Sequence, residues 1–439
     1  MGSYLLASTP VHGHVTPVLS VARHLVSTGH RVRFLTGARY AAAVELTGAQ
    51  FIPLPAEADF DDRDIDAAFP GRAERRGIDR MRFDAEAIFL TPIPAQVAAV
   101  DAACAEAAAA GEPIDAILAE TMFVAMAALA LRSSAERPPL VNLGVIPLPV
   151  PSVDTAPFGL GMAPLTGPVG RLRNMALGWV ADRLVFDHLH RRAREVLSAV
   201  DGRDLPANTF EAVGRVDAIV QLTVPSFEYP RSDLPETVHF VGPVQGRQPR
   251  ASALPAWWSD LSSARRVVHV TQGTVANRDF TELVRPTIEA LAGEDVLVVV
   301  ATGGRPIEEV GPLPANARVA EFICYDALLP FVDVVVTNGG YGGVHEALRR
   351  GIPLVTIGTT EDKPEVVARV NWSGVGIGMR TNRPSARTIR RAVRRVLEDD
   401  SFAQAAARIA AEIEAAPGCA GIDDVLASLS GMQPALAAV

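Results

Sequence analysis

The sequence predicts an α/β protein with two domains, each built around a parallel sheet. Residues 4–8 and 31–36 are short strand-like runs, and apolar residues recur at helical spacing between them, which is a βαβ opening. Residues 332–336 form a second apolar run, typical of a buried parallel strand, and a glycine-rich turn and a helix follow it. A chain of 439 residues has the length of two such domains.

Composition excludes several classes of protein. An apolar content of 49% and a charged content of 21% are those of a soluble globular chain. The net charge of −9 argues against a nucleic-acid partner. The three cysteines lack metal-site spacing, and no basic segment precedes the first apolar run, so we expect a reduced, cytoplasmic protein without a secretion signal. No apolar stretch is expected to reach the length of a membrane span.

The glycine-rich turn at residues 337–346 is the strongest functional signal. Glycines at a strand-to-helix turn let backbone N–H groups approach an anion, and the helix N-terminus adds partial positive charge. We therefore predict a phosphate or diphosphate site, and prefer it to a turn whose glycines serve only packing. Glu346 lies in the following helix, where its carboxylate can accept hydrogen bonds from sugar hydroxyls. The turn residues are Asn338, Gly339, Gly340, Gly342 and Gly343.

Two polar residues follow strands of the first domain. His14 lies in the loop predicted after the first strand, and Thr16 is expected to cap the next helix. Glu120 ends the predicted strand at residues 115–120. Ligands bind at the carboxyl edge of open parallel sheets, so both positions are candidates for a site. Each also has a simpler interpretation, as a polar surface histidine and a solvated or helix-capping glutamate.

Two motifs together resemble the family-one glycosyltransferases, which have the GT-B fold of two Rossmann-like domains facing across a cleft. The glycine turn resembles their donor-binding signature, in the form typical of bacterial macrolide-type members, and the His-Gly-His-Val-x-Pro segment from His12 resembles their N-terminal signature. The resemblance implies that His14 is the general base, that Glu346 holds the ribose and that the Gly342–Gly343 backbone faces the phosphates. Glu120 stands where the family usually has the aspartate that orients the histidine. Asn338 replaces the family histidine that contacts the diphosphate.

The resemblance also implies further donor contacts. Thr274 follows the first strand of the second domain and matches the diphosphate turn. Phe322 would stack on the pyrimidine while the Ile323 backbone bonds its edge; a core aromatic is the alternative for Phe322. Asp362 and Lys363 match the family's Asp-Gln pair, which contacts the sugar. Lys363 is the sole lysine of the chain, and its alternative is a surface ion pair with a neighbouring glutamate.

Domain boundaries follow from linker composition. We predict an acceptor-binding domain at residues 1–243, a linker at 244–256 and a nucleotide-sugar domain at 257–439, and leave open that the last helix packs back on the first domain. The loop at residues 147–168 is rich in proline, glycine and apolar side chains. We interpret it as part of an apolar acceptor pocket through Phe158, Leu160 and Met162, with an ordinary connection as the alternative.

These observations predict an inverting, metal-independent glycosyltransferase that needs no cofactor beyond its co-substrate. It would transfer a sugar from a UDP- or dTDP-sugar to a hydroxyl of an apolar small molecule such as a polyketide, macrolide or phenolic natural product, as a monomer or homodimer. Two alternatives stay open: a nucleotide-sugar epimerase on the same fold, and a catalytically silent protein that activates a partner enzyme. The sequence does not specify the acceptor, the sugar or the pyrimidine.

Overall fold

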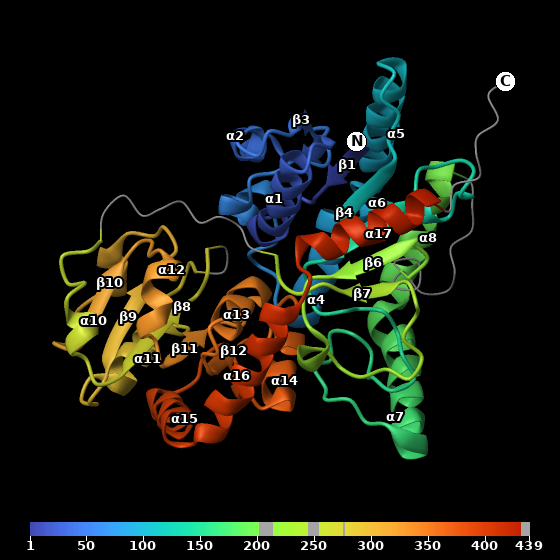
Figure 1. Ribbon diagram of the computed structural model, residues 1–439. Coiled ribbons are helices and arrows are strands. Elements are labelled where there is room, and N and C mark those ends of the chain that lie inside the picture. The colour runs from blue at the N-terminus through green and yellow to red at the C-terminus, as the bar shows by residue number, and fades with distance from the viewer. Residues whose placement is uncertain (202–213, 245–253, 275–276, 432–439) are drawn as a thin grey trace.

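Two parallel sheets, each with helices on both faces, form the framework of the protein (Figure 1). The computed structural model describes residues 1–201, 214–244, 254–274 and 277–431. The first sheet has seven strands in the order β3-β2-β1-β4-β5-β6-β7, and the second has six in the order β10-β9-β8-β11-β12-β13. Both orders are doubly wound, which confirms the predicted pair of Rossmann-like sheets. We call the parts built on them the N-terminal unit and the C-terminal unit.

The strands are short and mostly buried. Those of the first sheet are β1 (Ser3–Ala7), β2 (Arg31–Thr36), β3 (Gln50–Pro53), β4 (Ala116–Glu120), β5 (Leu140–Gly144), β6 (Ala218–Gln221) and β7 (Val238–Phe240). Those of the second are β8 (Val267–Thr271), β9 (Leu297–Ala301), β10 (Ala317–Ala320), β11 (Val334–Thr337), β12 (Leu354–Ile357) and β13 (Gly376–Met379).

Helices connect the strands and cover the sheets. Around the first sheet lie α1 (His12–Ser27), η1 (Ala38–Tyr40), α2 (Ala41–Glu45), η2 (Asp62–Asp64), α3 (Ile65–Ala68), α4 (Gly77–Asp84), η3 (Ala85–Leu90), α5 (Ile93–Ala109), α6 (Ala125–Ala130), α7 (Gly167–Val180), η4 (Ala181–Phe186), α8 (Asp187–Asp201) and η5 (Pro225–Phe227). The rest of the chain forms α10 (Asp260–Ser263), α11 (Val284–Leu291), η6 (Ile307–Val310), α12 (Tyr325–Leu328), η7 (Leu329–Phe331), α13 (Tyr341–Leu348), α14 (Lys363–Ser373), α15 (Ala386–Glu398), α16 (Asp400–Ala415) and α17 (Cys419–Gly431).

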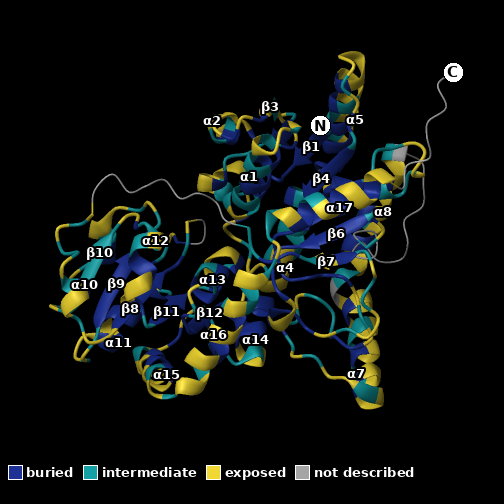
Figure 2. Cartoon of the chain, viewed as in Figure 1, coloured by how far each residue is buried: buried dark blue, intermediate teal, exposed yellow. Residues whose placement is uncertain are grey.

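Each sheet divides its unit into two hydrophobic cores, one on each face. Side chains alternate along a strand, so Leu5 of β1 packs on one face while Leu6 packs on the other. In β11, Val335 and Val336 separate in the same way. Because both faces are covered, these strands are apolar throughout, and the buried residues lie at the centre of each unit (Figure 2).

The first sheet ends at β7, which pairs in parallel with β6 through Ile219 and Val238 and forms one edge. Strands β3 and β13 lie at other edges and were not predicted. Two residues of β3, Gln50 and Pro53, are exposed, so this strand lacks the apolar run by which a buried strand is recognised.

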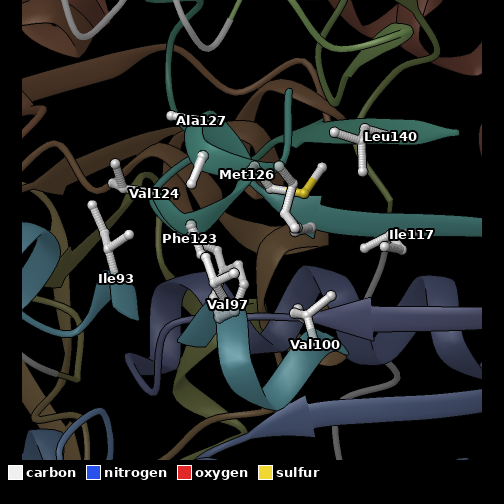
Figure 3. Packing of buried hydrophobic residues seen from close by; sticks show 14 of the residues in the cluster. Ile93, Val97, Val100, Ile117, Phe123, Val124, Met126, Ala127 and Leu140 are labelled. Atoms are coloured by element: carbon white, nitrogen blue, oxygen red, sulfur yellow. The ribbon is translucent and has the colours of Figure 1, made fainter. Parts of the chain in front are cut away.

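A helical run from Gly77 to Ala109 is long and apolar enough, by length and composition, to cross a membrane. We expected no stretch of that kind from the sequence. In the structure, Ile93 and Val97 of α5 are buried in the same cluster as Ile117 of β4, as the close view shows (Figure 3). The apolar side of α5 is thus covered by the first sheet, and the run includes a core helix of the N-terminal unit.

The last helix, α17, packs on the first sheet rather than the second. Ile422 and Val425 lie in the same buried cluster as Val18 of α1. His24 Nε2 and Asp423 Oδ2, 2.7 Å apart, join α1 to α17. The chain therefore returns from the C-terminal unit to the N-terminal unit in its last helix. The predicted division at residues 244–256 stays a prediction, because residues 245–253 lie outside the described part of the chain.

Candidate active site

A histidine–carboxylate pair lies where the first sheet reverses its strand order. Strands β1 and β4 are neighbours there, with Ala7 opposite Ala119. His14, in the first turn of α1, approaches Glu120 at the end of β4, and their Nδ1 and Oε2 atoms are 2.8 Å apart. This is the topological switch point, where open α/β sheets bind their ligands.

The Glu120 carboxylate is completely buried and fixed by backbone donors. Thr9 N–H donates to Oε1 over 3.1 Å, and Met122 N–H donates to Oε2 over 2.7 Å. A carboxylate that accepts these bonds also accepts one from the Nδ1–H of His14, which leaves Nε2 as the basic nitrogen of the ring.

The pKa of His14 is set by opposing effects. Burial lowers the pKa, but the neighbouring Glu120 carboxylate outweighs it, and Asp362 and Glu361 add to the rise, so the net pKa lies above its ordinary value. The effect of Asp362 shows that the start of α14 faces the start of α1, so the two units bring their polar groups to a common site. A histidine held in this way is suited to accept a proton.

Helix α1 begins earlier than predicted. His12 is its first residue, so His14 belongs to the helix and not to a loop. Thr16, expected as the cap, lies in the second turn, where its hydroxyl donates to the His12 carbonyl over 2.7 Å. The His12 backbone N–H donates to Asp62 over 2.7 Å and so ties the helix to a neighbouring segment. Starting the helix at residue 12 fixes His14 on a rigid element.

The glycine turn exposes an uncapped helix N-terminus. Gly339 has a φ of +80°, and Gly340 precedes α13 without any side-chain cap. The first helical bond there is from Val344 N–H to the Gly340 carbonyl, so the preceding amides have no partner in the helix. A Cβ at exposed Gly342 or Gly343 would meet nothing within 4 Å. An open helix N-terminus of this kind is suited to binding an anion through its backbone N–H groups.

A second turn lies beside it, because β8 and β11 are neighbours in the sheet. Gly273, at φ +71°, and the exposed Thr274 follow β8. The Asn338 amide donates to the Gln272 carbonyl over 2.6 Å and ties the two turns together. The structure thus gives Asn338 a bracing contact that the sequence did not predict. Its predicted contact with a diphosphate stays a prediction.

Glu346 lies further along α13 than the sequence suggested. It is the sixth of eight helical residues, one turn beyond Gly342 and Gly343. It is half-buried, and burial raises the pKa of its carboxyl. The Glu346 charge also contributes to the raised pKa of Tyr325, after burial as the main cause, so the two side chains are neighbours. Because Glu346 lies one helical turn beyond the glycines, a ligand with its phosphate at the glycine turn would present the next chemical group along the ligand to Glu346.

Phe322 is not a core aromatic. Its side chain is 66% exposed, which excludes that alternative, whereas Ile323 is buried. A Cβ on Gly304, at φ +89°, would come within 2.7 Å of the Phe322 ring, so the glycine makes room for it. An exposed ring resting on a glycine is suited to stacking against a planar ligand.

Asp362 and Lys363 open helix α14 beside the glycine turn. Lys363 is buried, its Cβ packs where Gly358 leaves space, and its Nζ pairs with Glu361. The alternative of a surface ion pair is therefore right about the pairing of Lys363 with Glu361. It is wrong about the exposure of Lys363, which is buried, although the Glu361 side chain is 52% exposed. Burial raises the pKa of Asp362 to about 6, the Lys363 charge opposes the rise and the Glu361 charge adds to it. Asp362 thus titrates close to neutral pH.

The apolar loop proposed for the acceptor bridges the two units. Phe158, Leu160 and Met162 are all half-buried, and their contact with an acceptor stays a prediction. The backbone N–H groups of Gly159 and Gly161 both donate to Glu365 Oε1 of α14 over 2.8 Å. The C-terminal unit therefore holds this loop in place.

The same contact belongs to a buried ion network that the sequence analysis missed. Arg369 of α14 is 1% exposed and donates from Nη1 to Glu365 over 2.8 Å and from Nη2 to Glu228 of the N-terminal unit over 2.5 Å. Arg231 also pairs with Glu228. Glu365 and Arg369 are one helical turn apart on a face that is otherwise apolar, and that spacing is the sequence signal for a buried pair.

Among the described residues, no group of three or more His, Cys, Asp or Glu side chains is arranged to hold a metal ion.

Comparisons with known proteins agree with this fold. Residues 285–429 match the model of the Erythromycin biosynthesis protein CIII-like C-terminal domain. The chain is 43% identical to 4'-demethylrebeccamycin synthase of Lentzea aerocolonigenes, over 97% of this chain and 99% of that protein. It is 33% identical to UDP-glucosyltransferase A1 of Starmerella bombicola, over 93% and 88% of the two chains.

Solved structures show the same architecture. The glycosyltransferase of kitacinnamycin superposes with a TM-score of 0.72 at 22% identity, over 98% of both chains. A calicheamicin glycosyltransferase superposes with a TM-score of 0.72 at 21% identity, over the whole of both chains. These likenesses show the GT-B fold.

The fold and the site define a GT-B glycosyltransferase. With a relative 43% identical over nearly its full length, the chain belongs to the family-one glycosyltransferases of the macrolide and natural-product type. The epimerase and the silent activator are not favoured, because the relatives named above are a synthase and a UDP-glucosyltransferase.

Proposed function

We propose that this protein is an inverting, metal-independent glycosyltransferase that moves a sugar from a UDP- or dTDP-sugar to a hydroxyl of an apolar small molecule. The observation that carries the proposal is the pairing of His14 with buried Glu120 in one unit, together with the uncapped glycine turn of α13 in the other. One unit supplies a base and the other an anion site, which are the two groups that a displacement at an anomeric carbon needs.

In this mechanism the acceptor hydroxyl attacks the anomeric carbon while its proton passes to Nε2 of His14. A new bond forms between the acceptor oxygen and the anomeric carbon. The bond from that carbon to the diphosphate oxygen breaks on the opposite face, which inverts the configuration. Glu120 stabilises the imidazolium that results, since its carboxylate remains hydrogen-bonded to Nδ1–H.

The departing nucleoside diphosphate takes up negative charge, and backbone donors are suited to receive it. The first turn of α13 and the turn at Thr274 offer N–H groups, and the helix dipole adds to them. We propose that this compensation replaces a metal ion. Transfer is then expected to persist in excess chelator, and a complete loss that magnesium reverses would contradict the proposal.

For the donor, we propose that Phe322 stacks on the pyrimidine with the Ile323 backbone at its edge, that Glu346 accepts from the ribose hydroxyls, and that Asp362 and Lys363 contact the sugar. Two structures of the same fold carry thymidine diphosphate, from VinC and from a spinosyn rhamnosyltransferase. Another carries the spinosyn aglycone, an apolar acceptor. These ligands support a pyrimidine nucleotide and a small-molecule acceptor here. We further propose the loop at Phe158, Leu160 and Met162 as the acceptor contact and the cytoplasm as the compartment.

The proposal is tested by product analysis with a panel of hydroxylated natural products and several nucleotide sugars. An α-linked donor should give a β-linked product, which the coupling constant of the anomeric proton reports. His14→Ala should lower transfer by about two to four orders of magnitude with nucleotide binding retained. A retained configuration, or near-normal turnover in that variant, would overturn the mechanism.

A further inference from the structure

The helix that runs through α7 and η4 carries an apolar stripe on its outer face. Its members recur at helical spacing and are 41% to 77% exposed: Val169, Leu172, Met175, Trp179, Val180 and Leu184. The opposite side is buried at Gly170, Asn174 and Ala181 and packs on the protein. The helix extends away from the body of the N-terminal unit, and its outer face is exposed along most of its length (Figure 2).

The stripe is larger than a soluble monomer ordinarily exposes. At these exposed fractions its side chains offer roughly 700 Å² of surface, against about 300–600 Å² for the largest apolar patch of a typical monomer. A stable interface buries about 800 Å² on each partner, so the stripe alone approaches the area that a dimer needs.

We propose that this stripe is a dimer interface at which α7 and η4 pack antiparallel against the same helix of a second copy. A twofold axis near Ala176 and Leu177 brings like surfaces together, as an isologous interface requires. Val169 then meets Leu184 of the partner subunit, and Met175 meets Gly178 of the partner subunit, where the absent side chain leaves room for the thioether.

Charge complementarity supports the same register. Arg171 and Asp182 are both exposed and lie at the margin of the stripe, equally far from the axis in opposite directions. Each would face its opposite in the partner subunit, giving two ion pairs per dimer. Within one chain, Arg171 Nε is 3.5 Å from Asp154 and its Nη2 donates to Ser232 over 3.3 Å, while Asp182 Oδ1 is 3.4 Å from His190. Both side chains are nevertheless more than half exposed and so are open to a partner.

A lipid surface fits the stripe less well. Helices that lie in a membrane interface carry basic residues beside their apolar face. Here Asp182 and Asp187 are interspersed with Arg171 and Arg183 along the exposed side, and the whole chain has a net charge of −9. Charges of both signs at the margin favour a protein partner with the same pattern.

Sedimentation velocity between about 0.5 and 50 µM tests the interface. Wild type should dimerise in this range. Met175→Asp should raise the dimer dissociation constant at least tenfold, since it places a charge at the centre of the interface. Leu46→Asp, at an apolar and 83% exposed position directly after α2, is the matched control and should leave the constant unchanged. Thermal melts of both variants confirm that the fold is intact.

A charge exchange tests the register itself. Arg171→Asp and Asp182→Arg should each weaken dimerisation about three- to tenfold, and the double variant should recover most of the loss. A wild type that stays monomeric at 50 µM, a dimer that Met175→Asp leaves intact, or a double variant as weak as the sum of the singles would overturn the proposal. Co-sedimentation with phosphatidylcholine–phosphatidylglycerol vesicles that Met175→Asp abolishes would overturn it in favour of a lipid surface.

Discussion

Glu120 acts on His14 through charge as well as position. Its carboxylate is the main reason that the pKa of His14 ends above the ordinary value despite burial, which by itself lowers it. In Glu120→Gln that charge is lost and the histidine pKa falls. Neutral histidine then persists to lower pH, so the acidic limb of the kcat/KM profile should move to lower pH.

The plateau of kcat/KM in Glu120→Gln should fall about ten- to a thousandfold, because a weaker histidine base is left and an amide cannot accept all three hydrogen bonds that Glu120 accepts. Glu120→Asp keeps the charge and is the control: its limb should stay near the wild-type position. The test is the pH dependence of kcat/KM for wild type, Glu120→Gln and Glu120→Asp. If the acidic limb of Glu120→Gln does not move, the Glu120 charge does not control the titration of His14.

Asp362 should make donor binding depend on pH. Its pKa is raised to about 6, mainly by burial, so the carboxylate is charged above that pH and protonated below it. A protonated group is a poorer acceptor for sugar hydroxyls. The affinity for a nucleotide sugar should therefore fall as the pH drops through about 6, while the affinity for the nucleoside diphosphate changes less. Calorimetry with both ligands measures the difference, and Asp362→Asn should remove it.

At the scale of the element, the first turn of α13 must leave its backbone amides open. Gly343→Asp should be tolerated by the fold, since a Cβ there meets nothing within 4 Å and a carboxylate in the first turn of a helix is favourable by about 0.3–1 kcal/mol. The same carboxylate should repel a diphosphate and weaken its binding at least tenfold. Gly343→Asn has the same size without the charge and serves as the control. Equal diphosphate affinities of the two variants in calorimetry would place the anion elsewhere.

At the scale of the whole molecule, Arg369 connects the two units. Its removal in Arg369→Met leaves the buried Glu365 carboxylate without its ion-pair partner and leaves Glu228 paired with Arg231 alone, and such a loss costs about 3–5 kcal/mol. Arg383 pairs with Asp279 at the surface, where its side chain is 69% exposed, so Arg383→Met should cost less than about 1 kcal/mol. Urea unfolding followed by tryptophan fluorescence compares them, and similar losses would contradict the role of the buried network.

The network also reaches the apolar loop. Glu365 receives two backbone bonds from Gly159 and Gly161 through the oxygen that Arg369 does not use. If the loop contacts the acceptor, Arg369→Met should raise the acceptor KM more than the donor KM. The ion network that joins the two units thus also holds the loop that is expected to contact the acceptor.

The sequence by itself determined the features that depend on neighbouring residues. Apolar runs specify buried strands such as β11, and glycines specify the open turn before α13. His14 and Glu120 could be placed at one sheet edge because strand ends in a parallel sheet share an edge. The start of α1 could not be placed, because Thr16 is a good cap by residue type, yet the helix begins at His12.

Only the tertiary structure decided the contacts between distant segments. Strand β3 forms because it pairs with β2, although its own sequence has no apolar run. Glu228 and Arg369 are 141 positions apart, and their pairing depends on how the units face each other. The carbonyl that Asn338 contacts and the phosphate that it was expected to contact are both hydrogen-bond acceptors, so residue type does not distinguish them. Local periodicity records which face of an element is apolar, but which surfaces meet is a property of the folded chain as a whole.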